Sequence, residues 1–358
     1  MTGFERGLLT LISLACIVGL ICWIGRDTAR YRKLVFATAA AVFVLVVLGA
    51  YVRLSDAGLG CPDWPGCYGN FMPTQSLKDI RAAEAVQPDG PVTLAKAWKE
   101  MAHRYLAMVV GAMIAALAFA AWWNRRALKQ SPGLATGLAV LVIFQAALGA
   151  WTVTMLLKPA IVTAHLMGGM AILALLIWLG LRQGLSLAAS RPVQISAPLR
   201  IFASVGLLVL IGQIILGGWV STNYAALACV DFPKCAGAWM PPMEFEHAFH
   251  VIRPLGVGPD GQFLSMDALR AIHWMHRIGA IITSAVLLAL AWQLRGRGLT
   301  ALAHGLVGLL ALQVLIGIGN VIWSLPLPLA VAHNGGAALL LGWLVLVNFR
   351  INVPAATH

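Results

Sequence analysis

The chain has 358 residues, of which 60% are hydrophobic and 11% are charged. A soluble domain cannot bury that much apolar surface, so the composition excludes a soluble protein and predicts an integral membrane protein. The formal net charge of +12 does not indicate nucleic-acid binding. Nearly all basic residues lie in short loops between apolar runs, where such charge sets the orientation of a protein in its membrane.

Nine apolar runs are long enough to cross a bilayer as helices, so the sequence predicts an all-α, polytopic fold. We interpret the first run as a retained helix and not as a cleaved signal peptide. It lacks the usual basic start and a small-residue cleavage site, and Arg26 follows it directly. In chain order, the nine runs are 8–25, 34–52, 102–123, 137–156, 160–182, 199–220, 270–294, 300–322 and 328–349.

Basic residues occur in alternate connections, which places those connections in the cytoplasm. The opposite short connections hold Lys158 or no charge at all. Two long loops, 53–98 and 221–269, are therefore predicted to face outward, with the N-terminus outside and the C-terminus inside. The basic residues that carry this prediction are Arg26, Arg30, Arg32, Lys33, Arg125, Arg126, Lys129, Arg182, Arg191, Arg200, Arg295, Arg297 and Arg350.

The chain contains an internal duplication. Cys61-Pro-Asp-Trp-Pro-Gly-Cys67 is matched, 168 residues later, by Cys229-Val-Asp-Phe-Pro-Lys-Cys235. The pair His103-Arg104 recurs as His276-Arg277, and His165 is matched by His333, again 168 residues later. Several landmarks in the same order at nearly the same spacing indicate a repeat.

Each half is therefore predicted to be a helix, a long outer loop, a helix with His-Arg, a helix, and a helix with His. We expect two pseudosymmetric four-helix bundles at 31–185 and 186–358, with an extra N-terminal helix in 1–30 and a linker near 184–192. Because each half has an even number of helices, the two halves run in the same direction through the membrane.

Four histidines, His103, His165, His276 and His333, lie within the first turns of helices that enter from the outside. Five to seven residues of helix correspond to a depth of roughly 8–10 Å. A single histidine there could simply bond a neighbouring carbonyl. Four at one depth, paired by a duplication, indicate function, because ionisable groups inside a membrane span are costly.

Two imidazoles per half favour haem iron. Zinc usually takes three or four protein ligands, and copper sites add Cys or Met, but no cysteine lies at this depth in the spans. Haem iron takes two axial histidines from facing helices of a bundle. Arg104 and Arg277 are then candidates for binding the haem propionates, with snorkelling at a helix end as the alternative. Small residues are expected to leave room for the porphyrin or, alternatively, to serve helix contacts: Gly168, Gly169, Gly335 and Gly336.

The cysteines of the two outer loops share one spacing. Cys61 and Cys67, like Cys229 and Cys235, are separated by five residues that include a proline. Paired cysteines outside the cytoplasm are typical of disulfides, so we predict one in each loop. Because each closes a small ring, a redox-labile role is the alternative to a structural one.

Glu100-Met-Ala-His-Arg104, the later histidine of each half and the outer cysteine loops resemble the haem A synthase family over residues 31–350. The resemblance implies two four-helix units that oxidise a ring methyl of haem O to a formyl, giving haem A for terminal oxidases, in a bacterial cytoplasmic (inner) membrane. It implies that His276 and His333 ligate a haem b and that His103 and His165 flank haem O. It also gives Glu100 a role in activity and implies a haem O-supplying synthase as a partner. The extra N-terminal helix departs from the family's eight-helix pattern.

The two halves differ at one position of the repeat. Glu100 lies three residues before His103, so the two share a helix face, whereas the corresponding residue of the second half is His273. A carboxylate beside a haem can accept a proton during oxidation of a methyl group. We therefore expect reaction in the first half, with Glu100 and His103 as its catalytic residues, and electron transfer in the second. The alternative is a salt bridge from Glu100 to Arg104 or Lys99, and His273 could contact the second haem or be an alternate ligand.

Two other functions are compatible with the same residues. One is a b-type di-haem cytochrome that passes electrons from quinol to a partner, and the other is a haem carrier without enzymatic activity. Quinone is a candidate electron acceptor for the enzyme, and both a monomer and a homo-oligomer fit the sequence.

Overall fold

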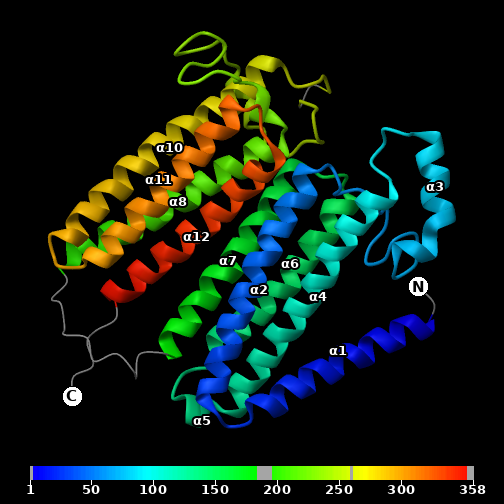
Figure 1. Cartoon of the computed structure of the whole chain (residues 1–358), viewed down its shortest axis with the longest axis vertical. Coiled ribbons are helices and arrows are strands. Elements are labelled where there is room, and N and C mark those ends of the chain that lie inside the picture. Colours follow the sequence, from blue (N-terminus) through cyan, green and yellow to red (C-terminus); the bar gives the residue numbers. More distant parts are fainter. Residues whose placement is uncertain (1–2, 184–195, 259–260, 353–358) are drawn as a thin grey trace. The chain divides into compact units, whose positions relative to one another are not determined.

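The computed structural model describes residues 3–183, 196–258 and 261–352. Within these ranges the chain consists of helices and loops, with three isolated β-bridges and no longer strand (Figure 1). The linker predicted near 184–192 and the predicted domain boundary at 185/186 lie outside the described residues. The helices are α1 (Gly3–Ile24), α2 (Thr28–Leu54), η1 (Pro73–Ser76), α3 (Leu77–Val86), α4 (Leu94–Trp123), α5 (Arg125–Leu128), α6 (Gly133–Thr154), α7 (Pro159–Gln183), α8 (Ala197–Thr222), η3 (Ala225–Leu227), α9 (Phe245–Ala248), α10 (Met266–Arg295), α11 (Thr300–Ile322) and α12 (Leu327–Asn352).

Eight helices of the described residues are long and apolar enough to cross a membrane: α2, α4, α6, α7, α8, α10, α11 and α12. They coincide with the second to ninth predicted runs, so these eight predictions are confirmed and the chain is a multi-pass helical membrane protein. Within the first predicted run, Leu14–Ile24 at the end of α1 is a shorter apolar helical segment.

Short polar residues fix where several spans begin. Asp27 precedes α2 and accepts the backbone N–H groups of Ala29 and Arg30. Thr93 caps α4 and Ser265 caps α10 in the same way. Side-chain oxygens at these positions satisfy backbone donors that have no partner within the helix. The helices α4 and α10, which carry His103 and His276, therefore have defined first turns.

Contacts divide the chain into two compact units, one formed by 1–157 with 171–184 and the other by 158–170 with 185–358. In the first unit, α4 packs against α1, α2 and α6. The face of α2 that is buried follows a helical period through Tyr31, Leu34, Val35, Thr38 and Val42. The amphipathic α3 lies in the outer loop and contacts the start of α4 (Figure 1).

In the second unit, four helices pack in a closed order. α8 contacts α10 and α12, and α11 contacts the same two helices. α10 and α12 are therefore diagonal to each other across the centre of this arrangement. The outer loop of this unit folds over α10 through η3 and α9.

Candidate functional site

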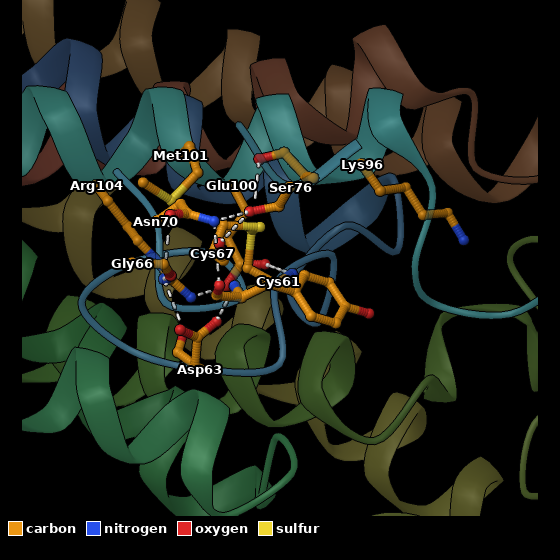
Figure 2. Close-up of a disulfide and its surroundings, with 12 residues drawn as sticks. Cys61, Asp63, Gly66, Cys67, Asn70, Ser76, Lys96, Glu100, Met101 and Arg104 are labelled. Atoms are coloured by element: carbon orange, nitrogen blue, oxygen red, sulfur yellow. Dashed lines mark hydrogen bonds and ion pairs between the residues drawn. A yellow bond between two sulfur atoms is a disulfide. The ribbon is translucent and has the colours of Figure 1, made fainter. Parts of the chain in front are cut away.

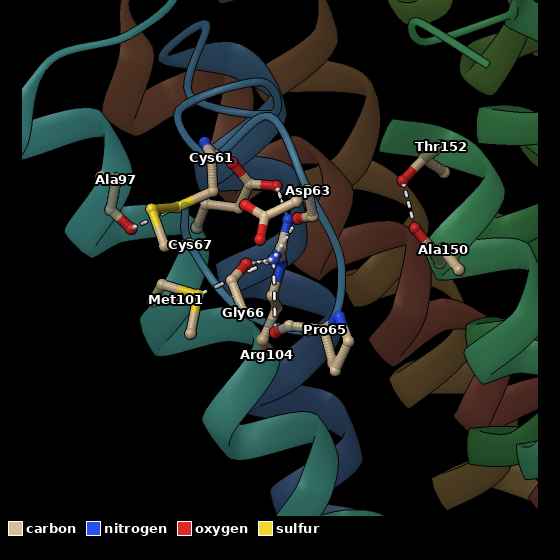
Figure 3. Close-up of polar contacts among 12 residues, drawn as sticks. Cys61, Asp63, Pro65, Gly66, Cys67, Ala97, Met101, Arg104, Ala150 and Thr152 are labelled. Carbon is tan, nitrogen blue, oxygen red and sulfur yellow. Dashed lines mark hydrogen bonds and ion pairs between the residues drawn. A yellow bond between two sulfur atoms is a disulfide. The ribbon is translucent and has the colours of Figure 1, made fainter. Parts of the chain in front are cut away.

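Glu100 and Arg104 bond the loop that precedes α4 to the N-terminal part of this helix. Glu100 is buried, with 5% of its surface exposed. One carboxylate oxygen accepts from Arg104 Nη2 at 2.5 Å, and the other accepts the backbone N–H of Cys61 at 2.8 Å. Arg104 Nη1 also donates to the carbonyl oxygens of Asp63, at 2.8 Å, and Gly66, at 2.5 Å (Figures 2 and 3). The salt bridge weighed as an alternative for Glu100 is thus present, and the carboxylate connects the helix to the loop.

The loop that these two side chains hold is closed by a disulfide. Cys61 is bonded to Cys67, and both are fully buried (Figure 2). Asp63 accepts the backbone N–H groups of Tyr68 and Gly69 at 2.6 and 2.7 Å, which closes the turn around the second cysteine. The predicted pairing is therefore present, and the loop is a compact cap on the outer end of α4.

The second unit repeats this cap. Cys229 is bonded to Cys235, as predicted, and Arg277 on α10 donates to the carbonyl oxygens of Lys234, Cys229 and Asp231 at 2.8–3.0 Å. Asp231 accepts the backbone N–H groups of Ala236 and Gly237. These hydrogen bonds, the one from Gly237 above all, hold the pKa of Asp231 below its usual value.

The residues three positions before the first histidine of each half both reach the outer loop. Glu100 accepts a backbone N–H, whereas His273, 6% exposed, places Nδ1 3.1 Å from the carbonyl oxygen of Ala225. The carboxylate and the imidazole therefore fill the same structural place with opposite hydrogen-bonding roles.

Three of the four histidines rest against glycines of a neighbouring helix. A Cβ atom placed on Gly49, Gly217 or Gly317 would lie 3.0 Å from Cε1 of His103, His276 or His333, respectively. Such a contact is tighter than an ordinary van der Waals distance, so a larger residue at any of these glycines would push the ring away by a few tenths of an ångström. The glycines therefore set the position of each imidazole.

His276 and His333 form a pair in the second unit. They lie on the diagonal helices α10 and α12. His333 Nδ1 is buried and has no hydrogen-bond partner among the described residues. Among the described residues no group of three or more His, Cys, Asp or Glu could hold a metal ion. Two rigidly seated imidazoles on diagonal helices of a four-helix arrangement fit the axial ligands of a haem.

The structure shows what four of the predicted residues contact or where they lie, and propionate binding by the two arginines stays a prediction. The guanidinium groups of Arg104 and Arg277 donate to loop carbonyls, although Arg277 Nε is buried without a partner in the described part of the chain. The space beside Gly336 is filled by the side chain of Gln313, so this glycine serves packing of a glutamine. His165 lies on α7 in the segment that clusters with the second unit.

Sequence reasoning missed the residues around the histidines. Gln213 and Gln313 contact His276 and His333, and Gly317 seats His333. Single glutamines and glycines in apolar helices match no motif. The signal in the sequence is the repetition of a glutamine four residues before a glycine that contacts a histidine ring, and of a second glycine three residues after that histidine.

Fold and site together define a multi-pass helical membrane protein with paired histidines suited to haem. Residues 32–345 match the family model of the cytochrome oxidase assembly protein family COX15-CtaA, and the chain belongs to this family. A relative from Shewanella oneidensis, named Heme A synthase, is 47% identical over 316 residues, which are 87% of this chain and 94% of the relative. Two further proteins with that name come from Methylobacterium sp., 29% identical over 89% of this chain and 91% of its own, and from Rhizorhabdus wittichii, 27% identical over 88% and 92%.

Proposed function

We propose that this chain is a haem A synthase, an oxidoreductase that converts the ring methyl of haem O to the formyl of haem A by two successive hydroxylations. The family assignment and the 47% identical relative named Heme A synthase support this function. The structural observation that carries it is the pair of glycine-seated imidazoles, His276 and His333, on diagonal helices of one unit.

The second half is the proposed haem b site. His276 and His333 would be its axial ligands, and haem b supplies one-electron transfer when bound. Arg277 is anchored to the outer loop through Nη1 and Nη2, and its Nε is the donor left for a propionate. In this proposal the chain's own residues fix the ligand geometry and hold the loop over the outer end of the site.

The first half is the proposed site of haem O. His103, seated on Gly49, would face the substrate together with His165, which is proposed from the internal repeat. Glu100 lies one helical turn from His103 and is the proposed proton acceptor during oxidation of the methyl group. The bond to Arg104 keeps that carboxylate in place, and Arg104 is a proposed partner of a haem propionate.

The wider setting follows from the sequence. We propose two pseudosymmetric four-helix bundles and a ninth span in α1, in the bacterial cytoplasmic membrane, with the N-terminus and the long loops outside. Water would supply the oxygen atom, a quinone is the candidate electron acceptor, and the synthase that makes haem O would supply the substrate. The repeated caps Cys61–Cys67 and Cys229–Cys235 support the duplication.

One experiment separates the enzyme from the two alternatives, a b-type cytochrome and a haem carrier. The protein is purified from a host that makes haem O, and its extracted haems are separated by chromatography. The enzyme yields haem A together with haem b. A b-type cytochrome yields haem b alone, and a carrier yields unaltered haem O, and either result refutes the proposal.

Glu100→Gln tests the assignment of the halves, because it removes the charge with little change of shape. We expect haem A formation to be lost while the haem b spectrum stays. Asp79→Asn, an exposed carboxyl on α3 of the same outer loop, is the matched control and should leave both unchanged. Loss of haem b with retained conversion in Glu100→Gln would assign the reaction to the other half.

A further inference from the structure

Gln213 on α8 is bonded to the proposed haem ligand His276 at two points. Its amide nitrogen donates to the backbone carbonyl oxygen of His276 at 3.0 Å and lies 3.0 Å from the ring nitrogen Nδ1. Its carbonyl oxygen packs where a Cβ of Gly279 would be. The glutamine thus lies between the ligand helix and its neighbour, in a space that only a glycine leaves open.

Gln313 on α11 makes the same arrangement at His333. Its amide nitrogen donates to the backbone carbonyl oxygen of His333 at 3.0 Å and lies 3.4 Å from ring nitrogen Nε2. Its carbonyl oxygen packs where a Cβ of Gly336 would be. Two separate pairs of helices therefore each place an amide beside a ligand ring, at Nδ1 in His276 and at Nε2 in His333.

The glutamine belongs to a sequence pattern that recurs around three of the four candidate histidines. A glutamine lies four residues before the glycine that contacts the histidine ring, and a second glycine lies three residues after the histidine. The first half keeps this pattern at His165, with Gln145 and Gly168, but has Leu45 and Leu106 at the corresponding positions for His103. Glutamine and glycine change together, as expected if the glycine exists to hold the glutamine.

The carbonyl oxygens of Gln213 and Gln313 are buried and have no hydrogen-bond partner among the described residues. A buried acceptor without a partner costs stability, so its retention calls for a reason. An imidazole that binds iron through one nitrogen carries its proton on the other, which then needs an acceptor. Rotation of the amide would exchange its bond to the backbone carbonyl for one from the ring, because it would bring the unused oxygen to that proton.

We propose that Gln213 and Gln313 are positioning residues that fix the ring orientation of His276 and His333 and tune the haem they bind. This inference rests on the proposed function, in which those histidines are the haem b ligands. A partner for the second ring nitrogen controls the basicity of a histidine ligand and thus the relative affinity of the site for oxidised and reduced iron. His103, whose repeat position for the amide is a leucine, receives no such tuning from that position.

The test is a redox titration of haem b in the full-length protein, with the electron paramagnetic resonance spectrum of the ferric form as a second readout. Gln213→Leu introduces the residue that the first half has at this position, Leu45. Gln213→Glu keeps the shape of the side chain, but an ionised carboxylate accepts hydrogen bonds and cannot donate them. We expect both variants to retain haem b and to change the ratio of affinities for oxidised and reduced haem about tenfold. This change corresponds to a shift of about 59 mV in the one-electron reduction potential. The potential should rise with leucine and fall with glutamate.

Gln293→Leu, on the same helix as His276 but near its other end, is the control and should leave the potential unchanged. Potentials equal to wild type in Gln213→Leu, Gln213→Glu and Gln313→Leu would overturn the inference while leaving the enzyme proposal intact. A wild-type protein that binds no haem b would instead refute the proposed haem site itself. If the leucine variants do not fold, the potential of Gln213→Glu alone tests the inference, and a value equal to wild type would overturn it.

Discussion

The glycine seat of His333 makes a quantitative prediction about haem binding. Gly317→Ala adds a methyl group whose carbon would lie 3.0 Å from Cε1 of His333, and ordinary contacts begin at 3.4 Å. The ring must therefore recede by about 0.4 Å. Ligand distances at a metal hold to about ±0.2 Å, so this displacement exceeds the tolerance of the iron–nitrogen bond.

Gly308→Ala is the matched control, because Gly308 is on the same helix and nothing lies within 4 Å of its Cβ position. Both substitutions gain about 1 kcal/mol of helix propensity, so their comparison isolates the contact with the ring. We expect Gly317→Ala to bind haem b about 10- to 100-fold more weakly than Gly308→Ala. The assay is haem b per polypeptide from the pyridine haemochrome spectrum, across a series of haem concentrations. Equal binding by the two variants would refute the role of the glycine seat.

Three further predictions concern the outer caps. Arg104→Lys keeps the charge but loses the planar guanidinium group, which bonds two loop carbonyls and Glu100 at once. It should lower the free energy of unfolding by about 1–3 kcal/mol, measured as a lower midpoint of thermal unfolding in detergent. An unchanged midpoint would contradict this prediction. Replacing Cys61 and Cys67 together by Ser removes a short covalent ring and should cost about 2 kcal/mol in the same assay, against no change on replacing the unpaired Cys16. Because the pKa of Asp231 is lowered by folding, its contribution to stability is present above the carboxyl pKa of the unfolded chain and is lost as the pH falls through the lower pKa of the folded state. Amide exchange at the two N–H groups it binds, corrected for intrinsic rates, should accelerate in that acidic range, and Asp231→Asn should remove the acceleration.

The membrane spans could be predicted from sequence because apolar length alone decides whether a helix crosses a bilayer. The disulfides followed from the matched spacing in two outward loops. The use of Arg104 and Arg277 could not be predicted, because their partners are backbone carbonyls, and the sequence does not show which carbonyls a folded loop leaves free. The side chain of Glu100 likewise reaches Cys61 only because the loop folds back over α4.

The surroundings of the histidines were missed for another reason. A glutamine in an apolar helix looks like a tolerated polar residue, and a glycine looks like a helix contact. Only the recurrence of the glutamine and the two glycines around several histidines distinguishes them, and that recurrence crosses helix boundaries. Gln213 and Gly279, for example, belong to α8 and α10.

The separation along the chain between each ligand and its amide has a consequence for biogenesis. Gln313 and His333 are 20 residues apart on helices joined by a tight turn, whereas Gln213 and His276 are 63 residues apart across the second outer loop. The longer closure costs about 1 kcal/mol more chain entropy. We therefore expect the α11–α12 hairpin to order its ligand as soon as it inserts, and His276 to be ordered only once the disulfide loop has closed over α10. Oxidative folding outside the membrane would then govern when the second half is ready to receive iron.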